Sequence, residues 1–494
     1  MPTVHPNRND FKTQAQTANL IPVYREIVAD MDTPVSAFKK LDDVECAYLL
    51  ESVEGGEKIA RYSFIGLHPI VTFKSKRHDV EITYASGKKE SFSDNSPLDR
   101  LREIMAGFRP VNDPGLPPFC GGAVGYVGYD EVRNFEPVGG GANDDLGLPD
   151  TLFVITESLV IFDHVRHRMK LVVNCHIQEG VDLDAAYDEA LAKINQLHQR
   201  LMRSLSSYDR TVSVGRCEIQ SNFTQDEFVE AVEKCKEYIA AGDVFQVVIS
   251  QRFNVSVTCE PFEIYRALRS VNPSPYMFYL KFKELKLVGS SPEILVKLTD
   301  DIVQVRPIAG TRKRGDTAEE DEALVQELLA DPKECAEHIM LVDLGRNDCG
   351  RVCEYGSVEV DDLMTVERYS HVMHIVSNVR GKLKKGKDAF DVFRAAFPAG
   401  TVSGAPKIRA MQIIDEVEQL NRGTYAGSVG YFSFNGNLDS CITIRTVLIK
   451  GDQAYVQAGA GIVADSDPVS EYRETINKAG AMIRAIEIAE YGMD

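Results

Sequence analysis

The sequence predicts an α+β protein with a large, mainly antiparallel β-sheet. Strand-like runs come in groups along the chain instead of alternating singly with helical runs, which argues against a doubly wound parallel sheet. The chain has 494 residues, of which 44% are hydrophobic, and this is ample material for a core. Because single cores stop growing at about 250–300 residues, we expect at least two structural units.

The N-terminal third consists mostly of short strand-like runs. Strands are expected at 47–51, 70–73 and 151–156, and a helix follows at about 182–203. A polar, serine-rich segment from Ser204 to Asn222 shows no periodicity, so we place the domain boundary there. The predicted division is an N-terminal region, 1–205, and a C-terminal domain, 206–494.

The patterns become clearer after this boundary. Thr224 and Glu227 form a capping box before a helix that Gly242 ends. Strands are expected at 244–257, 276–282, 285–289, 294–298, 302–307, 426–434, 440–449 and 453–459. Helices are expected at about 317–330, 332–342, 406–419 and 468–491, the second with Asp331 as N-cap and Pro332 as its first residue.

Composition and charge argue against several classes of protein. The 55 Lys and Arg residues against 74 Asp and Glu give a net charge of −19, which repels a phosphate backbone, so no nucleic-acid partner is expected. No apolar run approaches the roughly 18 residues of a membrane span, and the first residues lack a signal peptide's apolar stretch. We therefore expect a cytoplasmic protein without membrane contact. The 10 cysteines form no paired Cys-x-x-Cys sets, which argues against a zinc or disulfide framework.

Two pairs of glutamates suggest a metal site. Glu334 and Glu337 share one face of an expected helix, and Glu471 and Glu474 repeat this spacing in another. Taken alone, each pair is more typical of a solvated surface. However, the first pair precedes the apolar run 339–344, and the second follows an expected glycine-rich loop at 459–465. Four carboxylates without thiolates suit a hard cation that retains water, so we predict Mg²⁺.

An arginine and a glycine-rich segment suggest an anionic substrate. Arg445 lies in the apolar, strand-like run 441–447 and needs an anionic partner, which a substrate carboxylate can supply. Backbone N–H groups around Gly461 can bind a second carboxylate. The residues alone therefore predict a Mg²⁺-assisted reaction on a small dicarboxylate, without identifying the reaction.

Four strings resemble those of the chorismate-utilising enzymes. They are Pro307–Arg312, Glu337–Asp348, Phe397–Lys407 and Gly459–Val463. The resemblance is dense over about 224–490 and thinner before that. It implies an α+β catalytic fold built on a large antiparallel β-sandwich with surrounding helices. It also implies a Mg²⁺ ion on the ring carboxylate of chorismate, and nucleophilic attack on the ring with loss of the 4-hydroxyl.

Two positions narrow what the resemblance implies. The aminodeoxychorismate synthases similar to this chain carry a nucleophilic lysine where this chain has Ala309, and isochorismate synthases carry a water-activating lysine where it has Gln246. A neutral amide is a poor general base, whereas ammonia needs none. The resemblance therefore implies amination of chorismate and elimination of pyruvate to give anthranilate, the first step of tryptophan biosynthesis. Aminodeoxychorismate synthesis and an inactive tryptophan-binding regulatory subunit are the alternatives.

The resemblance also implies a role for each matching residue. Glu293 would be the general acid, His374 would act in pyruvate elimination, and Thr401 would orient groups near the leaving oxygen. The metal ligands would be Glu334, Glu337, Glu471 and Glu474, and the substrate would contact Gly310, Thr311, Tyr425, Arg445, Gly459, Ala460 and Gly461. L-tryptophan would inhibit by binding Glu51, Ser52, Pro275, Tyr276 and Met277. Because no segment resembles a glutaminase, a separate glutamine amidotransferase subunit would supply ammonia in a hetero-oligomer.

Overall fold

The computed structural model describes residues 3–42, 44–53, 61–140, 142–205, 217–369 and 372–492. The first part of the chain forms β1 (Val4–His5), α1 (Arg8–Gln14), β2 (Leu20–Val28), α2 (Pro34–Leu41), β3 (Ala47–Glu51), β4 (Tyr62–Lys76), β5 (Asp79–Tyr84), β6 (Lys89–Ser93), α4 (Pro97–Ala106), β7 (Gly122–Val127), η1 (Tyr129–Asn134), β8 (Thr151–Asp163), β9 (Arg168–His176) and α5 (Leu183–Leu201). The expected mixture of strands with few helices is confirmed here.

The second part is richer in helices. It forms β10 (Gln220–Ser221), α6 (Gln225–Ala240), β11 (Gln246–Ser256), α7 (Pro261–Val271), β12 (Tyr276–Lys281), β13 (Lys286–Ser291), β14 (Ile294–Thr299), β15 (Ile302–Val305), β16 (Ile308–Lys313), α8 (Ala318–Ala330), α9 (Pro332–Gly350), β17 (Glu359–Arg368) and β18 (Val372–Lys382). It ends with α10 (Ala389–Ala396), η2 (Gly400–Val402), β19 (Gly404–Ala405), α11 (Lys407–Val417), β20 (Ser428–Ser433), β21 (Leu438–Ile442), β22 (Thr446–Lys450), β23 (Gln453–Ile462) and α12 (Pro468–Tyr491).

Antiparallel pairing links 23 strands within the described ranges into one branched sheet. One branch runs from β4 through β3, β12, β13, β22 and β23 to β11. The other runs from β8 through β7, β20, β21 and β14 to β15 and β18. Buried side chains from both branches, such as Phe278 and Val429, belong to one apolar cluster. The branches therefore pack face to face, and the predicted α+β fold with a large antiparallel sheet is confirmed.

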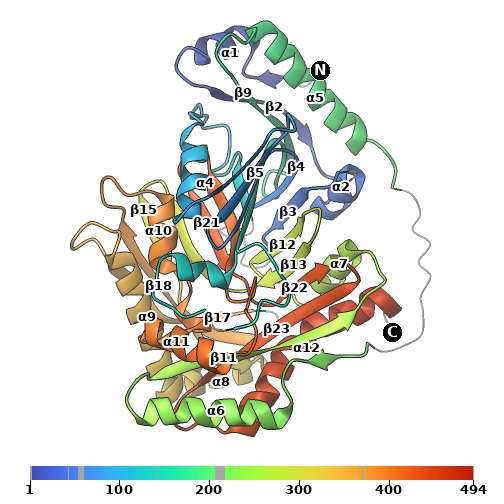
Figure 1. Cartoon of the computed structure of the whole chain (residues 1–494). Helices are drawn as coiled ribbons and strands as arrows, with labels where there is room; N and C mark the ends of the chain where they lie inside the picture. Colours follow the sequence, from blue (N-terminus) through green and yellow to red (C-terminus); the bar gives the residue numbers. More distant parts are fainter. Residues whose placement is uncertain are drawn as a thin grey trace.

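Helices cover the outer surfaces of the sheet (Figure 1). Helices α2, α5, α7 and α12 share a core cluster with the first branch, and α4 and α10 share one with the second. Strand pairing also crosses the predicted domain boundary, since β3 pairs with β12 and β7 with β20. The division at 205/206 stays a prediction, and residues 206–216 of the boundary segment lie outside the described residues. Among those described, no helix combines the length and apolarity of a membrane span.

Several local expectations are confirmed and others are wrong. Thr224 forms a capping box with Glu227, and Asp331 accepts hydrogen bonds from the first turn of α9, as predicted. The expected strand at 440–449 is instead two strands, because Arg445 has a φ of +51° and turns the chain between β21 and β22. The expected loop at 459–465 is wrong in its first half, since β23 continues through Gly461 to Ile462. The sequence patterns did not indicate α7, α10, β17 or β18.

Candidate active site

The first acidic pair lies in the opening turns of α9. Asp331 caps this helix through the N–H groups of Lys333 and Glu334. The Oε1 atom of Glu334 accepts from Arg312 Nη1 at 3.2 Å, and Oε1 of Glu337 accepts from Gln246 Nε2 at 3.2 Å. Negative side chains are favoured at such a helix start, where unpaired backbone N–H groups carry partial positive charge.

The second acidic pair lies in the opening turns of α12. Glu474 forms an ion pair with Lys478 at 2.6 Å. Burial raises the pKa of Glu471, and the charge of Glu474 adds to this rise, while Ser466, Lys478 and Lys333 oppose it. Lys333 belongs to the first turn of α9, so the acidic starts of the two helices lie within electrostatic reach of each other.

A glutamine and a glycine connect these helices to β11 and β23. Gln246 begins β11 and is 5% exposed. A Cβ atom at Gly461 would lie 2.7 Å from Gln246 Nε2, so a side chain at position 461 would displace this amide. Gln246 therefore lies between Glu337 of α9 and the strand that carries Gly459, Ala460 and Gly461. Ala460 itself is fully buried opposite Ile249.

Glu293 is the enclosed acid of this region. It follows β13, and protein surrounds its carboxyl group although part of the residue stays accessible. Burial raises the pKa of Glu293, while the Thr401 hydroxyl and the charges of Arg445 and Lys478 oppose the rise. The Thr401 hydroxyl is buried without a hydrogen bond of normal geometry among the described residues. A carboxyl group in this environment is favoured in its protonated form.

Two cations and a tyrosine lie within electrostatic reach of Glu293. Arg445 Nη1 donates to the carbonyl oxygen of Lys478 at 3.2 Å, and Lys478 Nζ donates to the carbonyl oxygen of Gly459 at 3.0 Å. Burial lowers the pKa of Arg445, and the charges of Glu293, Tyr425 and Glu474 oppose this. Burial raises the pKa of Tyr425 to about 12, and a Cβ atom at Gly459 would lie 2.7 Å from its hydroxyl. The predicted substrate residues of β23 thus lie beside Tyr425 and Lys478.

His374 lies on β18 beside β16, which carries Gly310 and Thr311. Its Nδ1 is 3.1 Å from the carbonyl oxygen of Gly310 and 3.0 Å from Thr311 Oγ1. Because a carbonyl oxygen can only accept, Nδ1 carries the proton, and Nε2 of the neutral ring is left as an acceptor. Burial lowers the pKa of His374; the Gly310 carbonyl opposes this and the charge of Arg445 adds to it. Gly310 has a φ of +70°, and a Cβ there would lie 3.2 Å from Glu334 Oε2.

The predicted inhibitor residues gather on β3 and at the start of β12. Glu51 pairs in register with Met277 and is buried, and it contacts the Tyr265 hydroxyl and Arg269 Nε, the latter at 3.3 Å. Burial raises the pKa of Glu51, which Arg269 and Tyr265 oppose. The Ser52 hydroxyl is buried and has no hydrogen-bond partner among the described residues. Pro275, just before β12, is buried, and the hydroxyl of Tyr276, the first residue of β12, donates to Asp439 at 2.8 Å.

The geometry adds one residue that sequence reasoning missed. Lys478 contacts Glu474, Gly459 and Arg445, and it contributes to the electrostatics of Glu293. Its position four residues after Glu474 on α12 was the available signal, since residues at i and i+4 share a helix face. That spacing alone predicts a surface ion pair, so it did not indicate a site.

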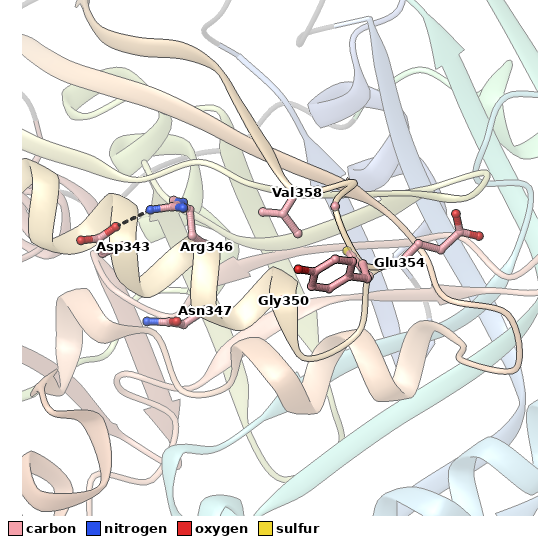
Figure 2. A pocket seen from close by; sticks show the side chains of 9 residues that line it. Asp343, Arg346, Asn347, Gly350, Glu354 and Val358 are labelled. Carbon is pink, nitrogen blue, oxygen red and sulfur yellow. Dashed lines mark hydrogen bonds and ion pairs between the residues drawn. The ribbon is translucent and has the colours of Figure 1, made fainter.

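A separate hollow of about 490 Å³ lies at the other end of α9 (Figure 2). Asp343, Arg346 and Asn347 of α9 and the turn around Tyr355 line it. Arg346 and Asp343 form an exposed ion pair at 2.9 Å within it. None of the predicted site residues lines this hollow, so we do not assign it to the candidate active site.

Comparison with known proteins agrees with this fold. A family model described as chorismate binding enzyme matches residues 45–484. The chain belongs to this family of enzymes. The anthranilate synthase component 1 of Acetivibrio thermocellus is 49% identical over 493 residues, covering 98% of this chain and 99% of the relative. That of Aquifex aeolicus is 50% identical over 484 residues, covering 97% of each chain.

Solved structures extend the comparison. The anthranilate synthase component I from Streptococcus pneumoniae TIGR4 superimposes with a TM-score of 0.78 at 38% identity, covering 92% of this chain and 99% of that one. The menaquinone-specific isochorismate synthase from Escherichia coli gives 0.70 at 20% identity, covering 97% and 98%, and so shares the fold. The resemblance inferred from the four sequence strings is confirmed.

Proposed function

We propose that the chain is the large subunit of an anthranilate synthase, which aminates chorismate with ammonia and then eliminates pyruvate to give anthranilate. The observation that best supports this is the enclosed carboxyl group of Glu293. Loss of the 4-hydroxyl requires a proton donor, and burial, which raises the pKa of Glu293, favours the protonated form that such a donor needs. The neighbouring Thr401 would orient the leaving oxygen.

Positions 309 and 246, which differ between family members that use different nucleophiles, support ammonia as the nucleophile here. Ala309 is buried in β16 and has no nucleophilic atom. Gln246 uses its amide N–H to hold Glu337 and cannot take a proton from water at neutral pH. Ammonia carries its own lone pair, so it can attack the ring without a base at position 246. A glutamine amidotransferase subunit is the proposed source of ammonia in the cell.

The acidic residues fit Mg²⁺ in their chemistry. All four are carboxylates, which Mg²⁺ prefers. Within the described ranges, no three acidic, histidine or cysteine side chains are grouped so that they could hold a metal ion by themselves. The proposed site would need only one or two of these carboxylates, with water and substrate completing the shell, as is usual for Mg²⁺. Glu337 and Glu474 would bind the ion, with Glu334 and Glu471 nearby or linked through water. When bound, Mg²⁺ would draw negative charge from the ring carboxylate of chorismate.

The remaining residues bind substrate and move protons. Arg445 and the backbone N–H groups of 459–461 would hold the substrate carboxylates, and Tyr425 would orient the enolpyruvyl group. The neutral ring of His374, with Nε2 as acceptor, would take up the proton that leaves during pyruvate elimination.

The second proposed property is feedback inhibition by L-tryptophan at β3 and β12. A buried carboxylate at Glu51 suits the ammonium group of an amino acid, and the buried Ser52 hydroxyl lacks a partner among the described residues. A buried, unsatisfied hydroxyl is unfavourable, and a polar ligand atom would relieve it.

One assay tests the catalytic proposal against its alternatives. The purified chain is incubated with chorismate and ammonium, with Mg²⁺ or with a chelator, and anthranilate fluorescence is recorded. We expect fluorescence that requires both ammonium and Mg²⁺. Conversion of chorismate to a non-fluorescent aminated product would favour an aminodeoxychorismate synthase. Tryptophan binding without any turnover would favour a regulatory subunit.

A further inference from the structure

A buried ion pair lies behind the candidate active site. Arg422 and Glu418 have side chains that are 1% and 5% exposed, and their nearest charged atoms are 2.6 Å apart. A second bond joins Arg422 Nε to Glu418 Oε2 at 2.9 Å, so the pair is bidentate. Burying two charges costs several kcal/mol per ion, and apolar residues often replace such a pair without loss of stability. Stability alone is therefore a weak explanation for this pair.

The other hydrogen bonds of Arg422 reach the backbone on two sides of the site. Arg422 Nη1 donates to the carbonyl oxygen of Val402 at 2.7 Å, and Nη2 donates to that of Val248 at 2.7 Å. Val402 directly follows Thr401. Val248 lies opposite Gly461 in the register of β11 and β23. One guanidinium group thus fixes the turn that carries Thr401 and the strand that supports Gly461.

Glu418 completes this arrangement. Its Oε1 accepts from the backbone N–H of Ser250 at 2.7 Å and from the Ser250 hydroxyl at 2.9 Å. Ser250 lies opposite Gly459 and also accepts a hydrogen bond from Gln457 Nε2 at 2.9 Å. The guanidinium of Arg422 also lies 5.6 Å from the ring centre of Tyr425.

We propose that Arg422 and Glu418 are positioning residues for catalysis, holding η2, β11 and β23 at the spacing that the substrate requires. The inference rests on the proposed function, because Thr401, Tyr425 and 459–461 take their roles from it. Neither side chain forms a hydrogen bond or ion pair with Glu293, Arg445 or His374 among the described residues, so the pair acts through the backbone it holds. Small displacements of positioned groups can lower a rate by up to about 100-fold.

Two variants separate positioning from stability. Arg422→Lys keeps the charge but cannot make the bidentate bond and both carbonyl bonds together. The double variant Glu418→Leu/Arg422→Met removes both charges and keeps the volume apolar. Arg8→Lys is the matched control, since Arg8 pairs with Asp184 and Asp188 at the surface, next to the N-terminal helices. For each variant, kcat and KM for chorismate are measured with the melting temperature and peptide-level hydrogen exchange.

We expect kcat to fall about 10- to 100-fold in both Arg422 variants. This loss should occur in the double variant even if its melting temperature equals that of the parent. Hydrogen exchange should rise in peptides covering 400–404 and 459–461 and stay at parental levels in α1 and α5. Parental kcat and KM in a folded double variant would overturn the inference. So would exchange that is unchanged, or that rises evenly over the chain. If the parent makes no anthranilate, the proposed function fails, while the exchange pattern still decides whether the pair holds these segments.

Discussion

Glu131 offers a pH-dependent test of the interior. It lies in η1 and is 1% exposed, and its carboxyl accepts from Asn134 Nδ2 at 3.0 Å and Thr151 Oγ1 at 3.3 Å. Burial raises the pKa of Glu131 from 4.5 to about 8; the charge of Asp150 adds to this, and the two hydrogen bonds oppose it. The folded protein therefore favours the protonated acid, whereas the unfolded chain ionises it above pH 4.5.

The sign follows from proton linkage. Between pH 4.5 and pH 8 the folded state binds more protons at this position than the unfolded state, so ionisation of Glu131 lowers the free energy of unfolding as pH rises. From pH 5 to pH 8 this loss amounts to about 3 kcal/mol. With an unfolding entropy of about 2.1 cal/mol/K per residue over 494 residues, that energy corresponds to about 3 °C in melting temperature.

The substitution Glu131→Gln removes this titration and keeps a side chain of the same shape. We expect the melting temperature of the variant, relative to that of the parent, to rise by about 3 °C between pH 5 and pH 8. Differential scanning calorimetry across this pH range measures it. The control is Glu233→Gln, which removes the same charge at an exposed position of α6. The difference in melting temperature between this control and the parent should stay nearly constant across the pH range. A constant difference for Glu131→Gln as well would refute the argument.

Four further predictions concern the site. Glu337→Gln should abolish Mg²⁺-dependent anthranilate formation, and near-normal turnover would refute the metal assignment. Glu293→Gln, which cannot donate the proton, should lower kcat at least 100-fold with chorismate binding retained; a minor effect would remove its role as general acid. His374→Ala should let an aminated intermediate accumulate, detectable by product chromatography, and anthranilate as sole product would contradict this. Ser52→Phe should relieve tryptophan inhibition and leave turnover intact, so unaltered inhibition would argue against the site on β3.

The parts of the fold that depend on residues close in sequence could be predicted from the sequence. Thr224 with Glu227 and Asp331 with Pro332 predicted helix starts, because capping uses side chains within one turn of the helix. The prediction of one strand at 440–449 was wrong because Arg445 has a positive φ, which its residue type does not favour and which the surrounding structure imposes. Residue spacing also gave no signal for the edge strand β17, whose side chains are mostly polar or exposed.

The sequence could propose residues for the candidate site but not their contacts. Glu334 and Glu337 were recognised by their spacing, yet the link from Glu337 to Gln246 joins positions 91 residues apart. Arg422 and Glu418 gave no signal, because an i, i+4 ion pair in sequence is normally a surface feature. Only the fold shows that this pair is enclosed between β11 and the turn of Thr401.

The sheet register joins the proposed inhibitor site to the proposed general acid. Glu51 lies opposite Met277, Met277 lies opposite Ser290, and Glu293 follows three residues later on the same segment. The Ser290 hydroxyl also contacts Asn272, in the loop that leads into β12. A ligand that changes the spacing of β3 and β12 would therefore act on β13, the strand that leads to Glu293. This short path would give the proposed inhibitor a physical means to lower the rate without occupying the substrate's place, and Ser52→Phe would act at its first step.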